Sequence, residues 1–411
     1  MKLTLQSQCF FRSIHRRVAC AALMLVLAPG ILTTSRVQAQ TYSVLYNFTG
    51  GADGSQPVGT LVMDSQGNLY GATKAGGNLN CSVNNLGCGV IFKFTAKGRL
   101  IVLHAFNGDT DGAEPEAGVF RNSRGEIFGT TSRGGDPACA WGNGKGCGTI
   151  YRLGSSDKET VIHTFNGLDE GAAPAAPVVQ DASGNLWGTT QFEGVSNPQC
   201  FGPGCGTLFK LGPEFKLTTY ALKGPPNDGY WPTASLVPGP GGNLYGTTLF
   251  GGAQNEGTVY RVSAKTGQVT ILHSFDLATG DAANPGSLLL SGGKIYGIAG
   301  PAGSFSGGTV FELDNTGESI FFNFGLAYNP AGNLLRDSIG NFYGQAGTTD
   351  ATGILYKLDT ANNLTVLHFF GGFPIDGDNS TGMVPDGHGN LYGITFGGGT
   401  TGAGTIFKLR P

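Results

Sequence analysis

The stretch GNLYGTT at residues 242–248 recurs along the chain and decides the fold class. Close copies are GNLYGAT at 67–73, GNLWGTT at 184–190 and GNLYGIT at 389–395. With weaker copies included, the aromatic residue of this element stands at seven positions, 47 to 59 residues apart: Tyr70, Phe128, Trp187, Tyr245, Tyr296, Tyr343 and Tyr392. A period near 50 residues that contains several short β-type runs is typical of a propeller, in which each repeat forms one blade. The sequence therefore predicts an all-β, seven-bladed β-propeller with four antiparallel strands per blade.

Each repeat contains four short runs of β-branched and aromatic residues bounded by Gly, Asn, Asp or Pro, which is the sequence signal of strands. The first run follows a proline, the second is the GNLYGTT element, and the third and fourth are exemplified by VYRV at 259–262 and ILHSF at 271–275. A glycine inside each second strand, such as Gly246, lowers stability unless the backbone must approach another group closely. We expect that the neighbouring blade supplies this group and that the preceding aromatic residue packs against the next blade.

The two ends of the repeat array are complementary. VLYNF at 44–48 has the pattern of a fourth strand and precedes the first repeat, whereas the last repeat stops after the third strand IFKL at 406–409. A closed ring then requires the N-terminal strand to complete the seventh blade. This pairing would protect the edge of the last blade and join it to the first.

The elements GNLYGTT, GG, GTVYRV and LHSF together resemble the Gloeo/Verruco (GloVer) tandem repeat of exported bacterial proteins. The resemblance covers essentially all of residues 41–411, although the copies at 296–299 and 343–346 lack the threonines. It implies export and a tandem repeat array. It implies no activity and no catalytic residues.

The first forty residues differ from the rest of the chain. Three arginines within residues 12–17 precede an apolar run at 18–27, and VQA at 37–39 supplies the small residues that a signal peptidase requires. This pattern predicts a signal peptide at 1–40 and the propeller at 41–411. A membrane-anchoring helix is the alternative, but the run is shorter than the roughly 20 residues that span a bilayer. We therefore expect a secreted protein, extracellular or periplasmic, with no membrane span in the mature chain.

Composition narrows the classes of partner. Only 13% of the 411 residues are charged and the net charge is -3, so the electrostatic attraction that drives binding to nucleic acid is missing. No GxSxG, HExxH or phosphate-binding glycine loop with a lysine is present. We expect no nucleic-acid partner, no cofactor and a monomer.

Six of the eight cysteines form three close pairs in equivalent loops, and the other two lie in the predicted signal peptide. An exported protein meets an oxidising compartment, so local disulfides are expected. The predicted bonds join Cys81 to Cys88, Cys139 to Cys147, and Cys200 to Cys205. Zinc would require a tighter cluster of four ligands, and we expect no metal.

The predicted strand order places long loops on one face of the ring and tight turns on the other. The loops between second and third strands are longest in the first three repeats, at 71–89, 129–148 and 188–206, and they contain the cysteine pairs. Binding residues tend to occupy loops that a rigid scaffold holds. A protease-resistant surface without a binding role is the alternative.

Aromatic rings in these loops suit the apolar faces of pyranoses and are also common at protein interfaces. The candidate ligand-binding residues are Trp141, Tyr230, Trp231, Asp111 and Asp228. Further loop aromatics and carboxylates on this face are Phe192, Phe201, Phe250, Asp53, Glu114, Glu116, Asp169 and Asp376. A glycosidase requires two carboxylates at a defined separation. Because several of these carboxylates recur as Asp-Gly before the first strand, a role in turns is expected first.

Two further patterns have structural interpretations. Histidine recurs at one position of the fourth strand, which Tyr or Phe occupies in other repeats, so packing is expected there: His104, His163, His273 and His368. NGDTDG at 107–112 matches the opening of a calcium loop, but Gly118 stands where a bidentate glutamate is required.

These observations favour an exported, non-enzymatic binding scaffold for extracellular carbohydrate or protein. The alternative is a polysaccharide lyase or glycoside hydrolase that acts on the loop-rich face through carboxylates and His or Tyr. A purely structural role in the cell envelope is the third hypothesis.

Overall fold

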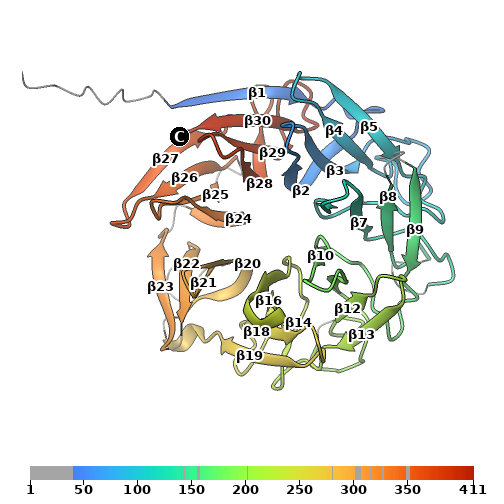
Figure 1. The fold of residues 1–411 in the computed structure, drawn as a ribbon, viewed down its shortest axis with the longest axis vertical. Coiled ribbons are helices and arrows are strands. Elements are labelled where there is room, and N and C mark those ends of the chain that lie inside the picture. Colours follow the sequence, from blue (N-terminus) through green and yellow to red (C-terminus); the bar gives the residue numbers. More distant parts are fainter. Residues whose placement is uncertain are drawn as a thin grey trace, which may run out of the picture. The chain divides into compact units, whose positions relative to one another are not determined.

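The computed structural model describes residues 40–411 except 140, 142–143, 155–157, 201, 280, 301–306, 315, 326–327 and 349–351. Residues 1–39 of the predicted signal peptide, with Cys9 and Cys20, lie outside these residues. The described chain forms seven four-stranded antiparallel sheets arranged as a ring, with the first strand of each sheet nearest the centre and the fourth at the rim (Figure 1). The predicted seven-bladed β-propeller is confirmed.

The blades follow each other in chain order, and their strands have these bounds. Blade one contains β2 (Ser55–Met63), β3 (Leu69–Ala75), β4 (Val90–Phe94) and β5 (Leu100–Ala105). Blade two contains β6 (Phe120–Arg121), β7 (Ile127–Thr131), β8 (Thr149–Leu153) and β9 (Glu159–Thr164). Blade three contains β10 (Val179–Gln180), β11 (Leu186–Thr190), β12 (Thr207–Leu211) and β13 (Leu217–Ala221). Blade four contains β15 (Val237–Gly239), β16 (Asn243–Thr248), β18 (Thr258–Ser263) and β19 (Val269–Ser274).

The second half of the ring follows the same plan. Blade five contains β20 (Ala283–Ser291), β21 (Lys294–Gly300), β22 (Thr309–Asp314) and β23 (Gly317–Asn323). Blade six contains β24 (Tyr328–Arg336), β25 (Phe342–Thr348), β26 (Ile354–Leu358) and β27 (Leu364–Phe369). Blade seven contains β28 (Asp378–Pro385), β29 (Leu391–Gly397), β30 (Thr405–Arg410) and β1 (Thr41–Asn47). A small extra sheet pairs β14 (Gly229–Tyr230) with β17 (Phe250–Gly251), and short 3-10 turns occupy Pro240–Gly242 and Leu277–Thr279.

The ring is closed by the N-terminal strand, as predicted. β1 pairs antiparallel with β30, with Thr41 opposite Arg410 and Asn47 opposite Thr405. On the inner side, the Thr381 hydroxyl donates a hydrogen bond of 2.9 Å to the carbonyl of Gly59 in blade one. The first and last blades are therefore joined at both the rim and the centre.

The glycine of the GNLYGTT element makes room for a ring of its own blade. A Cβ atom on Gly71 would lie 2.6 Å from Cζ of Phe92, the residue opposite it on β4, and 2.9 Å from Leu61. The same clash with the opposite aromatic occurs in every other blade, at Gly129–Tyr151, Gly188–Phe209, Gly246–Tyr260, Gly297–Phe311, Gly344–Tyr356 and Gly393–Phe407. Our expectation that the neighbouring blade requires this glycine was wrong, because the third-strand ring of the same blade fills the space.

These third-strand rings then form the contacts between blades. The Tyr151 ring of blade two lies 5.2 Å from the Phe106 ring, which follows the fourth strand of blade one. Equivalent contacts join Phe48 to Phe92, Phe165 to Phe209, Phe275 to Phe311, Phe324 to Tyr356 and Phe370 to Phe407. Glycine and aromatic residue are thus one packing unit that recurs around the ring.

The Asn and Tyr of the element close the tight turn that precedes it. Asp64 accepts hydrogen bonds from the Gln66 and Asn68 amides, from the Asn68 side chain and from the Tyr70 hydroxyl. On the other side, the Arg121 guanidinium of blade two lies 5.2 Å from the Tyr70 ring centroid, so Tyr70 does pack against the next blade. Partial burial opposes ionisation of Asp64, but the hydrogen bonds outweigh it and lower the pKa of this carboxyl.

Candidate functional site

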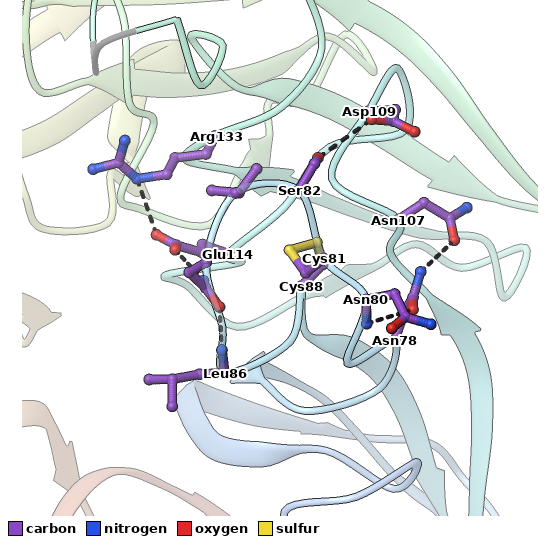
Figure 2. The surroundings of a disulfide bond; sticks show 12 residues. Asn78, Asn80, Cys81, Ser82, Leu86, Cys88, Asn107, Asp109, Glu114 and Arg133 are labelled. Atoms are coloured by element: carbon purple, nitrogen blue, oxygen red, sulfur yellow. Dashed lines mark hydrogen bonds and ion pairs between the residues drawn. A yellow bond between two sulfur atoms is a disulfide. The ribbon is translucent and has the colours of Figure 1, made fainter.

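The loop-rich face carries three disulfide-bonded loops. The predicted pairs Cys81–Cys88, Cys139–Cys147 and Cys200–Cys205 are bonded, with Cα atoms 5.3, 5.9 and 5.3 Å apart. Each bond lies against the glycine that follows the fourth strand of its blade: Gly108, Gly167 and Gly224. Figure 2 shows the first loop, where Ser82 bonds to Asp109 on one side of the disulfide and Glu114 pairs with Arg133 on the other. The loops are thereby fixed to the blades beneath them.

Four half-buried aromatic side chains form a continuous row across blades two, three and four. The Trp141 and Phe192 rings are stacked, with centroids 5.3 Å apart. Phe192 meets Trp231 edge to face at 5.4 Å, and Trp231 meets Phe250 in the same way at 5.4 Å. We call Trp141, Phe192, Trp231 and Phe250 the aromatic row. The sequence predicted these residues as separate candidates, and the fold brings them together.

The repeat geometry explains why the row is continuous. Phe192 and Phe250 occupy the same repeat position just after the second strand, and Arg133 occupies it in blade two. Each of them pairs through its backbone with a residue of the loop that leads into the first strand. Phe192 forms an antiparallel β-bridge with Ala172, and Phe250 pairs with Tyr230. Side chains at this position therefore lie at equivalent places in successive blades.

Trp231 occupies a backbone position that does not suit it. Its φ of 57° is left-handed, as at the equivalent residues of five other blades, which are Gln56, Glu114, Ala173, Asn284 and Asn379. This conformation costs a residue with a Cβ atom about 1–2 kcal/mol, and Asn tolerates it better than a bulky residue. The indole Nε1 of Trp231 is also buried without a hydrogen-bond partner in the described part of the chain. A strained backbone and an unsatisfied donor are typical of a functional position.

Glu193, next to Phe192, is a second residue of this kind, and the sequence reasoning missed it. Its φ is 61°, whereas blades one, two, four and seven have a left-handed glycine at the same position: Gly76, Gly134, Gly251 and Gly398. Burial raises the pKa of its carboxyl. Among the described residues, no hydrogen bond or ion pair holds this carboxylate. Aligning the repeats with one another would have revealed a glutamate where four other blades have glycine.

A cation lies at the Trp141 end of the row. The Arg133 guanidinium carbon is 5.1 Å from the Trp141 ring centroid, and its Nε is 3.1 Å from an oxygen of Glu114. Asn84 donates a hydrogen bond to the other oxygen of Glu114, which fixes that carboxylate. The row therefore ends in a charged group that is held in place on two sides.

The other predicted site residues lie outside the row. Tyr230 is fully buried beneath it, with its ring 5.5 Å from that of Phe250. Asp228 is 8% exposed and accepts a 2.6 Å hydrogen bond from the Lys223 amide, while burial raises its pKa. Asp111 accepts bonds from the Asn107 amide and side chain and lies 3.2 Å from His104. Both carboxylates hold loops, as the Asp-Gly pattern suggested, and Phe201 lies outside the described residues.

The aromatic row reaches the mouth of the central channel. A cavity of about 700 Å³ lies at the centre and is lined by all seven blades, including Gly59, Pro177, Phe250 and Thr381. Glu116 also lines it and forms an ion pair of 2.8 Å with Lys74. Phe250 thus belongs both to the row and to the wall of the channel.

The family assignment follows from residues 28–197 and 137–346, which match the Gloeobacter/Verrucomicrobia repeat. The chain belongs to the Gloeobacter/Verrucomicrobia repeat family. These matches include the loops that carry the aromatic row. A comparison with curated proteins finds no match.

Solved structures show the fold of this family member. The extracellular domain of the hybrid two-component system BT4673 from B. thetaiotaomicron matches with 14% identity and a TM-score of 0.55, over 90% of this chain and 42% of that one. A Mycobacterium tuberculosis puromycin-hydrolyzing peptidase matches with 10% identity and a TM-score of 0.50, over 84% of this chain and 50% of that one. This chain thus spans half of these proteins or less. A protein described as a gluconolactonase matches over 91% of this chain and 92% of its own, with 12% identity and a TM-score of 0.44. Among the described residues, no helix is long and apolar enough to cross a membrane.

Proposed function

We propose that this repeat protein is an exported, non-enzymatic binding scaffold that holds an extracellular carbohydrate chain on the aromatic row. The observation that carries the proposal is the contact of four half-buried aromatic rings from three blades on one face. Such rings present apolar surface at little cost in side-chain entropy, which suits the flat faces of pyranoses. A row that extends over three blades suits several consecutive sugar units better than a single sugar.

Polar groups beside the rings complement the hydroxyls of a sugar. The Glu193 carboxylate can accept a hydrogen bond, and the Arg133 guanidinium can donate one at the far end of the row. Trp231 and Glu193 both have a left-handed backbone that other blades give to smaller residues. The left-handed conformation at Trp231 belongs to the repeat, whereas at Glu193 a glutamate stands where four other blades have glycine, and this supports a role for Glu193 in binding.

The disulfide-bonded loops support binding by a preorganised surface. Each loop is bonded near the base of the row and packs against its own blade, so little ordering remains when a ligand binds. The three disulfides and the signal-like residues 1–40 support export to an oxidising compartment. We therefore propose that the mature chain begins near residue 41.

The alternative of a lyase or hydrolase has one supporting observation, the raised pKa of Glu193. Glycoside hydrolysis requires a second carboxylate at a defined distance from the first. Glu114, the carboxylate at the Trp141 end of the row, already pairs with Arg133 and Asn84. A binding role needs no such partner, and we favour it.

A glycan panel tests the proposal. The purified protein is screened for retained glycans, and release of reducing ends and of unsaturated products is followed in the same wells. We expect one class of polysaccharide to bind without turnover. Trp141→Ala should weaken binding about 5- to 30-fold, since truncation of an anchoring aromatic costs about 1–2 kcal/mol.

The matched control is Phe369→Ala, which removes a 63% exposed ring at the end of β27, outside the row. Unchanged binding in this variant would exclude a general effect of surface hydrophobicity. Polysaccharide turnover by the wild type that is lost in Glu193→Gln would support the enzyme hypothesis in place of the binding role. Equal loss of binding in Trp141→Ala and Phe369→Ala would contradict the proposed site.

A further inference from the structure

Three potential metal ligands meet at the rim of the ring, between blades four and five. His273 lies on β19, Asp281 on the loop that follows it, and Glu318 at the start of β23 in the next blade. His273 Nε2 is 2.7 Å from Asp281 Oδ2, and one ligand atom from each of the three residues lies within 4.8 Å of the other two. The group shares blade four with Phe250 of the aromatic row but lies on the fourth strand of that blade, and the sequence has no cysteine after Cys205.

The repeats provide internal comparisons for this group. The same pair of histidine and carboxylate occurs in three other blades, as His104–Asp111, His163–Glu170 and His368–Asp376. These pairs explain the recurrent histidine, which the sequence assigned to packing. What varies is the residue that the next blade places against the pair.

At the boundary of blades six and seven, Tyr42 takes that place, and its ring stacks on His368 at 3.6 Å. At the boundary of blades one and two, Glu159 stands at the position equivalent to Glu318, four residues before the ring position of its strand. Among the described residues, only His273, Asp281 and Glu318 come close enough together to share an ion.

The group contains two carboxyl groups and one histidine, and Asp281 and Glu318 also hydrogen-bond to each other through a proton that a bound metal ion would displace. Asp281 has 8% of its side chain exposed, and Oε1 of Glu318 is buried without a hydrogen-bond partner in the described part of the chain. No lysine or arginine forms an ion pair with either carboxylate among the described residues. A buried carboxylate oxygen without a donor is costly, and a bound cation would satisfy it.

We propose that His273, Asp281 and Glu318 bind one divalent transition-metal ion, with Zn²⁺ as the best fit. Imidazole nitrogen and carboxylate oxygen are both ligands that Zn²⁺ accepts, and three protein ligands leave a position for water. The amide of Ala282 donates a 2.7 Å hydrogen bond to Asp281 Oδ1, which orients this carboxylate. The His273 ring is fixed edge-on against Phe275 at 4.7 Å.

The ion would join the outer strands of two blades that no disulfide holds together. This role is independent of the proposed carbohydrate site, and it differs from the sequence expectation of no metal. The ligands belong to two repeats, 45 residues apart at the extremes. Their spacing therefore has no resemblance to a local zinc motif.

The test is Zn²⁺ binding by the chelator-stripped protein, measured by calorimetry and by the midpoint of thermal unfolding. We expect one equivalent of Zn²⁺ to bind and to raise the midpoint, because a ligand that binds only the folded state stabilises it. Glu318→Gln keeps the shape of the side chain and should abolish both effects. His273→Ala should do the same.

The matched control is Glu159→Gln at the equivalent position of blade two, which should bind Zn²⁺ like the wild type. Two results would overturn the proposal. One is that the wild type binds no Zn²⁺ and gains no stability from it. The other is that binding persists in Glu318→Gln, which would place the ion elsewhere.

Discussion

The indole of Trp141 lies stacked on the ring of Phe192, with centroids 5.3 Å apart and an angle of 24° between the planes. The two residues belong to different blades, and each lies in a loop that a disulfide fixes to its own blade. The contact therefore links two preorganised loops. It is the start of a surface that no single blade could provide.

The backbone strain at Glu193 predicts a stability gain when the side chain is removed. Glu193→Gly restores the residue that four other blades use, and it should raise the free energy of unfolding by about 1 kcal/mol. Glu193→Gln keeps the strain and removes only the charge. The pKa of Glu193 is raised in the folded state, so its carboxyl group contributes most to the free energy of unfolding below its ordinary pKa of 4.5, where it is protonated. This contribution is lost as the pH rises through the folded-state pKa. Chemical denaturation of the three proteins at pH 4 and pH 8 measures both effects, and a less stable Glu193→Gly would contradict the assignment of strain.

The glycine after the fourth strand supports the disulfide. A Cβ atom on Gly108 would lie 2.7 Å from Cys88 Sγ, and φ is 89°. Gly98 has a similar φ of 81°, but a Cβ there would meet nothing within 4 Å. Gly98→Ala should lower the free energy of unfolding by about 1 kcal/mol, from backbone strain alone. Gly108→Ala should lower it by about 1–3 kcal/mol more, because the new methyl group would collide with the disulfide. Equal losses for the two variants in urea unfolding would show that contact with the disulfide has no role.

The pairing of glycine and ring can be tested in blade three. A Cβ atom on Gly188 would lie 2.3 Å from Cζ of Phe209, so Gly188→Ala should destabilise the fold by about 1–3 kcal/mol. Phe209→Leu alone also destabilises, because it leaves a cavity. In the double variant the shorter leucine side chain makes room for the new methyl group. The double variant should therefore lose less stability than the sum of the losses in the two single variants. A double-mutant cycle measures this coupling, and additive losses would refute the pairing.

The tight turns predict the acid limit of stability. Asp64, Asp181, Asp337 and Asp386 are each partly buried, which opposes ionisation, but hydrogen bonds outweigh this and lower each pKa below 3.8. A carboxyl group whose pKa is lowered by folding stabilises the folded state at pH values above its pKa in the unfolded chain. This stabilisation is lost as the pH falls through its pKa in the folded state. We expect the free energy of unfolding to fall steeply below about pH 4. Asp64→Asn should be less stable at pH 7 and flatter in acid, and an unchanged acid slope would contradict this account.

The sequence predicted the fold because the determining signal repeats. Seven copies of one element define the number of blades, and the unmatched strand at 44–48 defines the closure. The cysteine pairs are local, so their bonds were also predictable. The partner of the GNLYGTT glycine was predicted wrongly, because sequence does not show which strand faces Gly71 across the sheet. Register places Phe92 there.

The site was predictable only as a set of candidates. Trp141 and Trp231 were named from their loops, but their connection through Phe192 depends on how three blades pack together. Asp111 and Asp228 looked equally available, yet the loops that they close use their oxygens. Glu193 gives a signal only when the repeats are compared.

Tryptophan fluorescence tests the central claim most directly, because the chain has 3 tryptophans and two of them lie in the aromatic row. The third, Trp187, is fully buried in blade three and cannot report a surface ligand. In a titration with a bound glycan from the panel, the emission of the wild type should change with saturation, and iodide should quench it less. Phe192→Ala interrupts the row but keeps both reporting tryptophans, so the saturable change should be lost or should require a much higher glycan concentration. A full response of Phe192→Ala at the wild-type glycan concentration would contradict binding on the aromatic row.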